Sequence, residues 1–141
     1  AARLRVAGVL QQLPVEVVLN QQNLAAIEEF VASSYTGHSF PPNLPPGPQG
    51  LKVFLSLFFS AFPDGKVAIE DMLSEGDKTA TRLVFSGTHT GDFMGIPPTG
   101  RKIAVPAIDL ARFENGKIVD HWGGPDQMAL MVQLGVVSMP G

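Results

Sequence analysis

The chain has 141 residues, of which 45% are hydrophobic and 16% charged, and its formal net charge is −3. Because the charge is negative and no basic run is longer than residues 100–102, we expect no nucleic acid partner. Cysteine is absent, which excludes disulfides, thiol catalysis and cysteine-ligated zinc and is compatible with a cytoplasmic protein.

The length predicts one domain over residues 1–141, large enough to bury a core and keep a ligand cavity. Residues 1–10 lack the apolar core and cleavage site of a targeting signal. The longest apolar run, residues 53–62, is too short to cross a bilayer. We therefore expect neither a targeting segment nor a membrane partner.

The first third of the chain predicts helices. Asn23 is a candidate N-cap for a helix that carries Leu24, Ile27 and Phe30 on one stripe. Residues 37–50 are dense in proline and glycine and predict an irregular loop. A second helix is expected from residue 48, where proline suits the first helical position. Its apolar residues predict burial nearly all round; they include Leu51, Phe54, Leu55, Phe58, Phe59 and Phe62.

Strands are predicted from residue 66 onward. Residues 66–76, 77–91, 101–114 and 116–122 are rich in β-branched and apolar side chains and are separated by turn signals. The Asn115-Gly116 pair predicts a tight hairpin. A last helix is expected over residues 124–134, with Gly135 as its stop. Helices, an antiparallel meander and a final helix predict an α+β fold.

The hairpin also predicts which side chains share a face. A two-residue loop places Arg112 opposite Val119 and Leu110 opposite His121. The face predicted to line a cavity then holds Ile108, Leu110, Arg112, Val119 and His121. The other face, with Asp109, Ala111, Phe113, Ile118, Asp120 and Trp122, could serve as a subunit interface. A slip of one residue would exchange these assignments.

Several polar residues are candidates for chemistry, each with a structural alternative. Asp126 is either a helix-capping carboxylate or a general base at the cavity wall. His121 is either a satisfied polar residue or a catalytic group, and Arg112 is either ion-paired or an oxyanion ligand. His38, His89 and His121 are too dispersed to predict a metal site.

Three stretches together carry a family resemblance: residues 61–64, "AFPD", residues 87–100, "GTHTGDFMGIPPTG", and residues 112–122, "RFENGKIVDHW", followed by Asp126 and "QLG". They resemble the SnoaL-like polyketide cyclases of the nuclear-transport-factor-like superfamily, over about residues 19–136. The resemblance implies a single SnoaL-like domain with a cone-shaped α+β barrel. In such a barrel a curved antiparallel sheet wraps helices around a hydrophobic cavity, commonly in a homodimer.

The resemblance also implies a reaction and a site. Family cyclases close a ring of a polyketide ester by intramolecular aldol condensation, without a metal or an organic cofactor, and their catalytic aspartate matches Asp126. Arg112 and His121 are the expected partners of this base. The expected substrate contacts are His38, His89, Trp122, Phe58 and Leu110. The chain departs from the family at residues 123–125, Gly-Gly-Pro, where an acidic residue often follows the tryptophan, and at Pro14.

The resulting hypothesis is that Asp126 removes a proton from a flat, apolar substrate and that the enolate attacks a carbonyl of the same molecule. His121 or Arg112 would stabilise the developing oxygen charge. Three alternatives stay open: a non-catalytic binding protein for an apolar small molecule, an isomerase or epoxide hydrolase on the same fold, and a dimeric adaptor with a filled interior.

Overall fold

A single curved sheet and five helical elements make up the described part of the chain. The computed structural model describes residues 12 and 14–138. In chain order the elements are η1 (Val15–Asn20), η2 (Leu24–Ala26), α2 (Ile27–Phe30), β1 (Val31–Gly37), α3 (Pro48–Ala61), β2 (Lys66–Glu75), β3 (Lys78–Thr88), β4 (Lys102–Glu114), β5 (Lys117–Pro125) and α4 (Gln127–Gln133). None of these helices is long and apolar enough to span a membrane.

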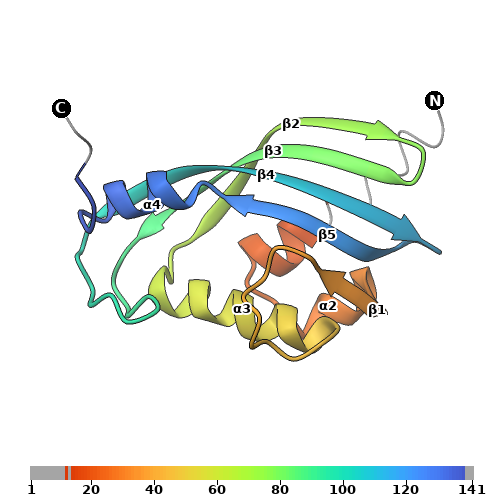
Figure 1. Cartoon of the computed structure of the whole chain (residues 1–141), viewed down its shortest axis with the longest axis horizontal. Helices are drawn as coiled ribbons and strands as arrows, with labels where there is room; N and C mark the ends of the chain where they lie inside the picture. The colour runs from red at the N-terminus through yellow and green to blue at the C-terminus, as the bar shows by residue number, and fades with distance from the viewer. Residues whose placement is uncertain (1–11, 13, 139–141) are drawn as a thin grey trace.

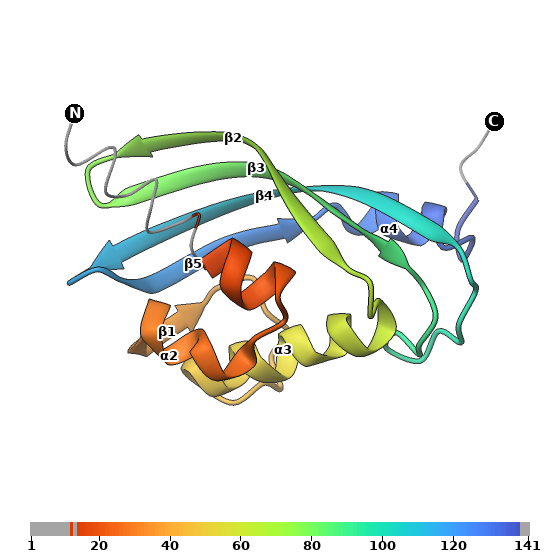
Figure 2. The same ribbon diagram turned by 180° about the vertical axis from the view of Figure 1, so that it is seen from behind.

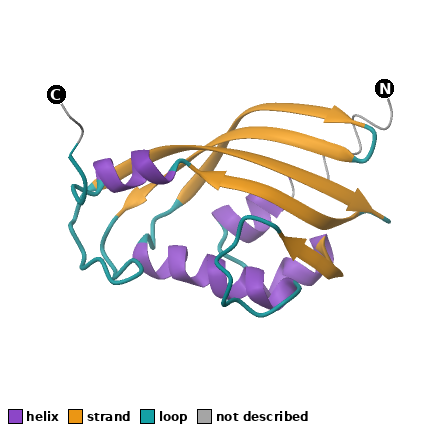
Figure 3. Ribbon diagram, in the orientation of Figure 1, coloured by secondary structure: helices purple, strands orange, loops and turns teal. Residues whose placement is uncertain are grey.

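The sheet arches over the helices. Figures 1 and 2 show, from opposite sides, α2 and α3 beneath the concave face, and Figure 3 shows the strands as one layer. The strand order is β1-β5-β4-β3-β2, which leaves β1 and β2 as the edges of an open sheet. The predicted α+β fold is confirmed, but the sheet does not close into a barrel.

Strand β1 corrects the expectation of a purely antiparallel sheet. It pairs in parallel with β5, whereas the other neighbouring strands are antiparallel. The sequence of β1, VASSYTG, has buried side chains only at Val31 and Tyr35. This spacing of four positions does not show the alternation by which a strand is recognised.

Two apolar clusters fill the space under the sheet. The first lies beneath β1, β4 and β5 and includes Ile27, Tyr35 and Phe113. The second lies between α3, β4 and α4; its members are Phe58, Ala61, Phe62, Phe93, Ile103, Val105, Leu130 and Leu134. Gln133 of α4 fixes the second cluster, because its side-chain amide exchanges hydrogen bonds of 2.7 and 2.9 Å with the backbone of Ala104.

The β4–β5 hairpin combines a predicted turn with an unpredicted bulge. Asn115 and Gly116 both have positive φ, as a two-residue hairpin turn requires. Phe113 pairs with Ile118 as predicted, but Arg112 pairs with Asp120 instead of Val119. Val119 is therefore an extra residue in β5. Beyond it, each β4 residue pairs with the β5 residue one position after its predicted partner.

The predicted assignment of faces was wrong, because the face of β4 that was expected at a subunit interface is the concave one, and the bulge adds His121 to it. Asp109 is now opposite Gly123, and Ala111 is opposite His121, on the concave face. Leu110 pairs with Trp122 and Arg112 pairs with Asp120 on the outer face. The predicted cavity face was thus wrong for Leu110 and Arg112, whereas His121 reaches the concave side only because the bulge shifts its register.

Candidate functional site

A pocket of about 350 Å³ lies between the concave face of the sheet and the helices. Its walls are largely apolar, and aromatic rings follow one another along α3 and the adjoining elements. These rings are Phe40, Phe54, Phe58, Phe59 and Phe85. The Phe40 and Phe54 rings are stacked with centroids 4.7 Å apart. An apolar pocket of this kind suits a hydrophobic small molecule that is oriented by a few polar groups.

Asp109 and His121 bring an acid and a base to the pocket wall. Within the described part of the chain they are the only carboxylate and the only imidazole in the lining. Oδ1 of Asp109 lies 3.3 Å from Nε2 of His121, and both side chains are about four-fifths buried. The two groups form no hydrogen bond with each other, and Asp109 Oδ1 and His121 Nδ1 are each buried without a hydrogen-bond partner among the described residues.

Unpartnered polar atoms of this kind are uncommon in folded proteins. A buried acceptor without a donor costs about 1–3 kcal/mol relative to one that is satisfied. Such an atom therefore calls for an explanation, and a ligand that completes the hydrogen bonds is one. The Asp109–His121 pair is in this respect unlike the outer-face ion pairs, whose polar atoms are matched.

Asp126 does not lie in the pocket wall, which corrects the prediction of a cavity-facing base. It is exposed at the N-cap of α4, and its carboxylate accepts a hydrogen bond of 3.0 Å from the amide of Ala129. Its neighbours Pro125 and Gln127 line the pocket, but Asp126 does not. The hydrogen-bond donor of this carboxylate is thus a backbone amide in the first turn of α4, and the bond holds the carboxylate away from the pocket.

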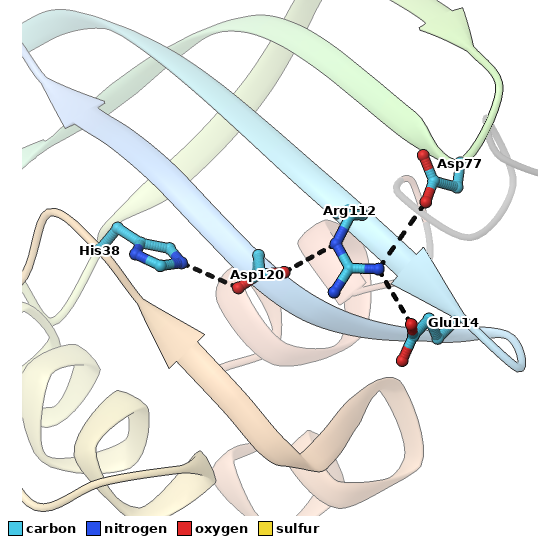
Figure 4. A network of polar contacts seen from close by, with 5 residues as sticks. All are labelled: His38, Asp77, Arg112, Glu114 and Asp120. Atoms are coloured by element: carbon cyan, nitrogen blue, oxygen red, sulfur yellow. Dashed lines mark hydrogen bonds and ion pairs between the residues drawn. The ribbon is translucent and has the colours of Figure 1, made fainter.

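Arg112 and His38 belong to a polar network outside the pocket (Figure 4), and Trp122 lies outside the pocket as well. Arg112 Nε donates to Asp120 Oδ2 at 2.8 Å, and His38 Nε2 lies 2.8 Å from Asp120 Oδ1. These contacts, that of His38 first, lower the pKa of the Asp120 carboxyl. The His38 ring stacks on Trp122 with centroids 4.7 Å apart. The network fastens the end of β1 to the hairpin, so its residues have a structural role.

The remaining predicted residues divide between core, surface and pocket. His89 is fully buried in the second cluster, where its Nδ1 accepts a hydrogen bond from the amide of Thr99. It secures the loop before β4 and does not line the pocket. Leu110 is partly exposed on the outer face. Phe58 and His121 are the predicted site residues that do line the pocket.

Asp109 was missed because its face of β4, which also carries Ala111 and Phe113, was expected to be a subunit interface and not the cavity wall. Its neighbours in β4 are Ile108 and Leu110, and an isolated carboxylate in an apolar strand is a signal that could have indicated it. The bulge that brings His121 to the same face leaves no such signal in the sequence.

The curved sheet over helices, with an apolar pocket beneath it, defines the class of cone-shaped α+β proteins. Residues 9–134 match the family model of the SnoaL-like polyketide cyclases, and the chain belongs to this family. The resemblance predicted from the sequence is thus confirmed.

Characterised cyclases are among its relatives. Aklanonic acid methyl ester cyclase DauD of a Streptomyces species is 29% identical over 77% of this chain and 70% of that enzyme. Aklanonic acid methyl ester cyclase DnrD of Streptomyces peucetius is 32% identical over 63% of this chain and 62% of that enzyme.

Solved structures share the fold. TsrD from Streptomyces laurentii superposes with a TM-score of 0.86 at 26% identity and covers 94% of this chain and 97% of its own. A SnoaL-like polyketide cyclase from Agrobacterium tumefaciens has a TM-score of 0.72 at 28% identity and covers 88% of this chain and 94% of its own.

Proposed function

We propose that this protein closes a ring in a polyketide methyl ester by intramolecular aldol condensation, with Asp109 and His121 as its acid/base pair. The observation that carries the proposal is this unpartnered pair in the wall of an apolar pocket. The substrate class comes from the relatives, which are cyclases of aklanonic acid methyl ester. Asp109 takes the place that the sequence had given to Asp126.

The proposed reaction gives each of the two groups one proton transfer. Asp109 accepts the proton of a carbon that lies between carbonyl groups, and the enolate carbon forms the new bond to a carbonyl carbon of the same molecule. The former carbonyl oxygen becomes an alkoxide and takes up one proton, which His121 can deliver. One C–H bond and the π bond of one carbonyl group are exchanged for one C–C and one O–H bond, and no water is lost, so the product is an isomer of the substrate.

The pocket contributes by shape as well as by polar groups. Its aromatic walls can hold a flat substrate with its two reacting carbons together, and such positioning can supply about 7–11 kcal/mol of the barrier. The general base adds about 10²–10⁴ in rate. Neither contribution needs an added oxidant or reductant.

The test is ring closure by the purified protein. Aklanonic acid methyl ester is incubated with and without the protein. The products are separated by chromatography and their masses are measured by mass spectrometry. A product of unchanged mass and altered retention supports the proposal. Saturable binding without any product would instead favour the non-catalytic binding protein. In a separate incubation with an epoxide, a product that is heavier by one water would favour the hydrolase.

We also propose that two copies associate through the outer face of the sheet. Leu73, Ala80, Leu110 and Trp122 are successive cross-strand partners from β2 to β5 and form an apolar row. The next row, Glu75, Lys78, Arg112 and Asp120, alternates in charge in a way that a two-fold axis can match. Leu73 is 71% exposed, which favours a partner over solvent.

Leu73→Glu tests this association. We expect wild-type protein to have twice the 15.0 kDa mass of the chain in light scattering and the variant to have the single mass, because a charge in an apolar interface stays unpaired. Leu57→Glu, at a residue also exposed but on α3, is the matched control and should leave the mass unchanged. A monomeric wild type, or a variant of unchanged mass, contradicts the proposal.

A further inference from the structure

Tyr35 is a third polar group of the pocket wall. It lies on β1, two residues before Gly37, which pairs with His121 on β5. The residue is only 4% exposed, yet it lines the pocket. Buried tyrosine hydroxyls usually have a hydrogen-bond partner, but among the described residues none is found for Tyr35. Its hydroxyl is also not among the fully enclosed polar atoms, so it is not sealed from contact.

The surroundings keep this phenol neutral. Burial, and then the charge of Asp109, raise the pKa of Tyr35 well above its usual value near 10. A neutral phenol donates a hydrogen bond, so Tyr35 is a donor over the whole physiological range. Tyr35, Asp109 and His121 all line the same pocket, so one ligand can meet all three.

We propose that the Tyr35 hydroxyl donates a hydrogen bond to the substrate oxygen that becomes negative when Asp109 takes the proton. This inference rests on the proposed function and gives a role to a residue outside the Asp109–His121 pair. Before proton transfer the negative charge lies on Asp109, and afterwards it lies on the enolate oxygen. A donor in the wall of the same pocket stabilises the charge that develops on this oxygen.

Tyr35 fills the role that the sequence had assigned to Arg112. Arg112 lies on the outer face, where Asp120 and Glu114 occupy its guanidinium. The Tyr35 phenol is uncharged, unlike a guanidinium. It lies in the wall of the apolar pocket, however, where a hydrogen bond to an oxyanion is stronger than in water. The Tyr35 hydroxyl thus stabilises mainly the state in which the substrate oxygen is negative, and it stabilises the bound substrate before proton transfer much less.

Tyr35→Phe is the variant that isolates the hydroxyl, because the ring and its packing remain. We expect kcat to fall about 10²–10³-fold, as for the loss of one oxyanion donor, with KM within about threefold of wild type because ground-state contacts persist. Thr79→Val, which removes an equally buried hydroxyl outside the pocket, should leave kcat unchanged. A Tyr35→Phe enzyme with wild-type kcat overturns the inference.

A binding experiment decides the matter even if no turnover is found. Asp109→Asn mimics the state in which the proton has been taken, so it is titrated with 4-nitrophenolate, followed by absorbance, and with the neutral ether 4-nitroanisole. Adding Tyr35→Phe should weaken phenolate binding about tenfold to a hundredfold, the worth of one charged hydrogen bond. It should leave the ether unaffected. Equal loss for both ligands, no loss, or no phenolate binding by Asp109→Asn contradicts the role of Tyr35, while the cyclase proposal stands or falls on turnover alone.

Discussion

Asp109→Asn is expected to lower kcat by about 10²–10⁴-fold, which is the usual contribution of a general base. The amide keeps the size and shape of the carboxylate but cannot accept the proton. KM should change little, because the apolar walls that hold the substrate are untouched. Steady-state turnover of aklanonic acid methyl ester by the wild type and the variant gives both quantities.

The same substitution should not destabilise the fold. Oδ1 of Asp109 is buried without a hydrogen bond, so a neutral amide removes a charge that the folded state holds at a cost. We expect the thermal midpoint of Asp109→Asn to equal or exceed that of the wild type. A loss of activity together with a raised midpoint is typical of a catalytic group and not of a structural one.

Asp126→Asn is the matched control, because it makes the same chemical change at the other candidate carboxylate. Asparagine caps helices about as well as aspartate, so α4 should persist and kcat should stay near that of the wild type. If instead Asp126→Asn abolishes turnover and Asp109→Asn does not, the assignment of the base to Asp109 is wrong and the sequence-based choice of Asp126 was right.

The parts of the fold that depend on local chemistry could be predicted from the sequence. The Asn115-Gly116 turn, the helix that begins at Pro48 and the strands of the meander all appear close to their expected bounds. Proline at a first helical position and a paired Asn-Gly turn each have one favoured backbone geometry. These features needed no knowledge of distant contacts.

The parts that depend on distant contacts could not be predicted. Strand β1 exists because β5 supplies its partners, and its own residues show no strand pattern. The bulge in β5 decides whether His121 or Trp122 shares the face of Asp109, because Val119 is the one extra residue between the Phe113–Ile118 and Arg112–Asp120 pairs. A shift of one residue reverses every side chain beyond it, so the candidate site was the least predictable part of the chain.

Asp126 shows how two roles of one residue type compete. The family resemblance favoured a base at this position, whereas the start of a helix favoured a cap. The structure has the cap, with Ala129 as its donor. The resemblance was informative about the fold and the family but did not determine which carboxylate enters the pocket.

Gly123→Ala is expected to lower the free energy of unfolding by about 2–5 kcal/mol, the sum of a left-handed backbone penalty and an overpacking cost. Gly123 has φ of 96°, and an added Cβ would lie 2.1 Å from the carbonyl oxygen of Ile108. That oxygen belongs to the backbone of β4, so it can move only if the strand moves. Denaturant unfolding of both proteins measures the difference.

Gly76→Ala separates the two causes. Gly76 also has positive φ, 60°, but an added Cβ there meets nothing within 4 Å. This control should cost only the backbone penalty, about 1–2 kcal/mol, and Gly123→Ala should cost more. Equal losses would mean that β4 yields to the methyl group without strain. In that case position 123 could also carry the acidic side chain that often follows the tryptophan in the family. If the losses differ as expected, an acid at 123 is sterically excluded in this backbone, and the carboxylate of the pocket has to come from the opposite strand, where Asp109 pairs with Gly123.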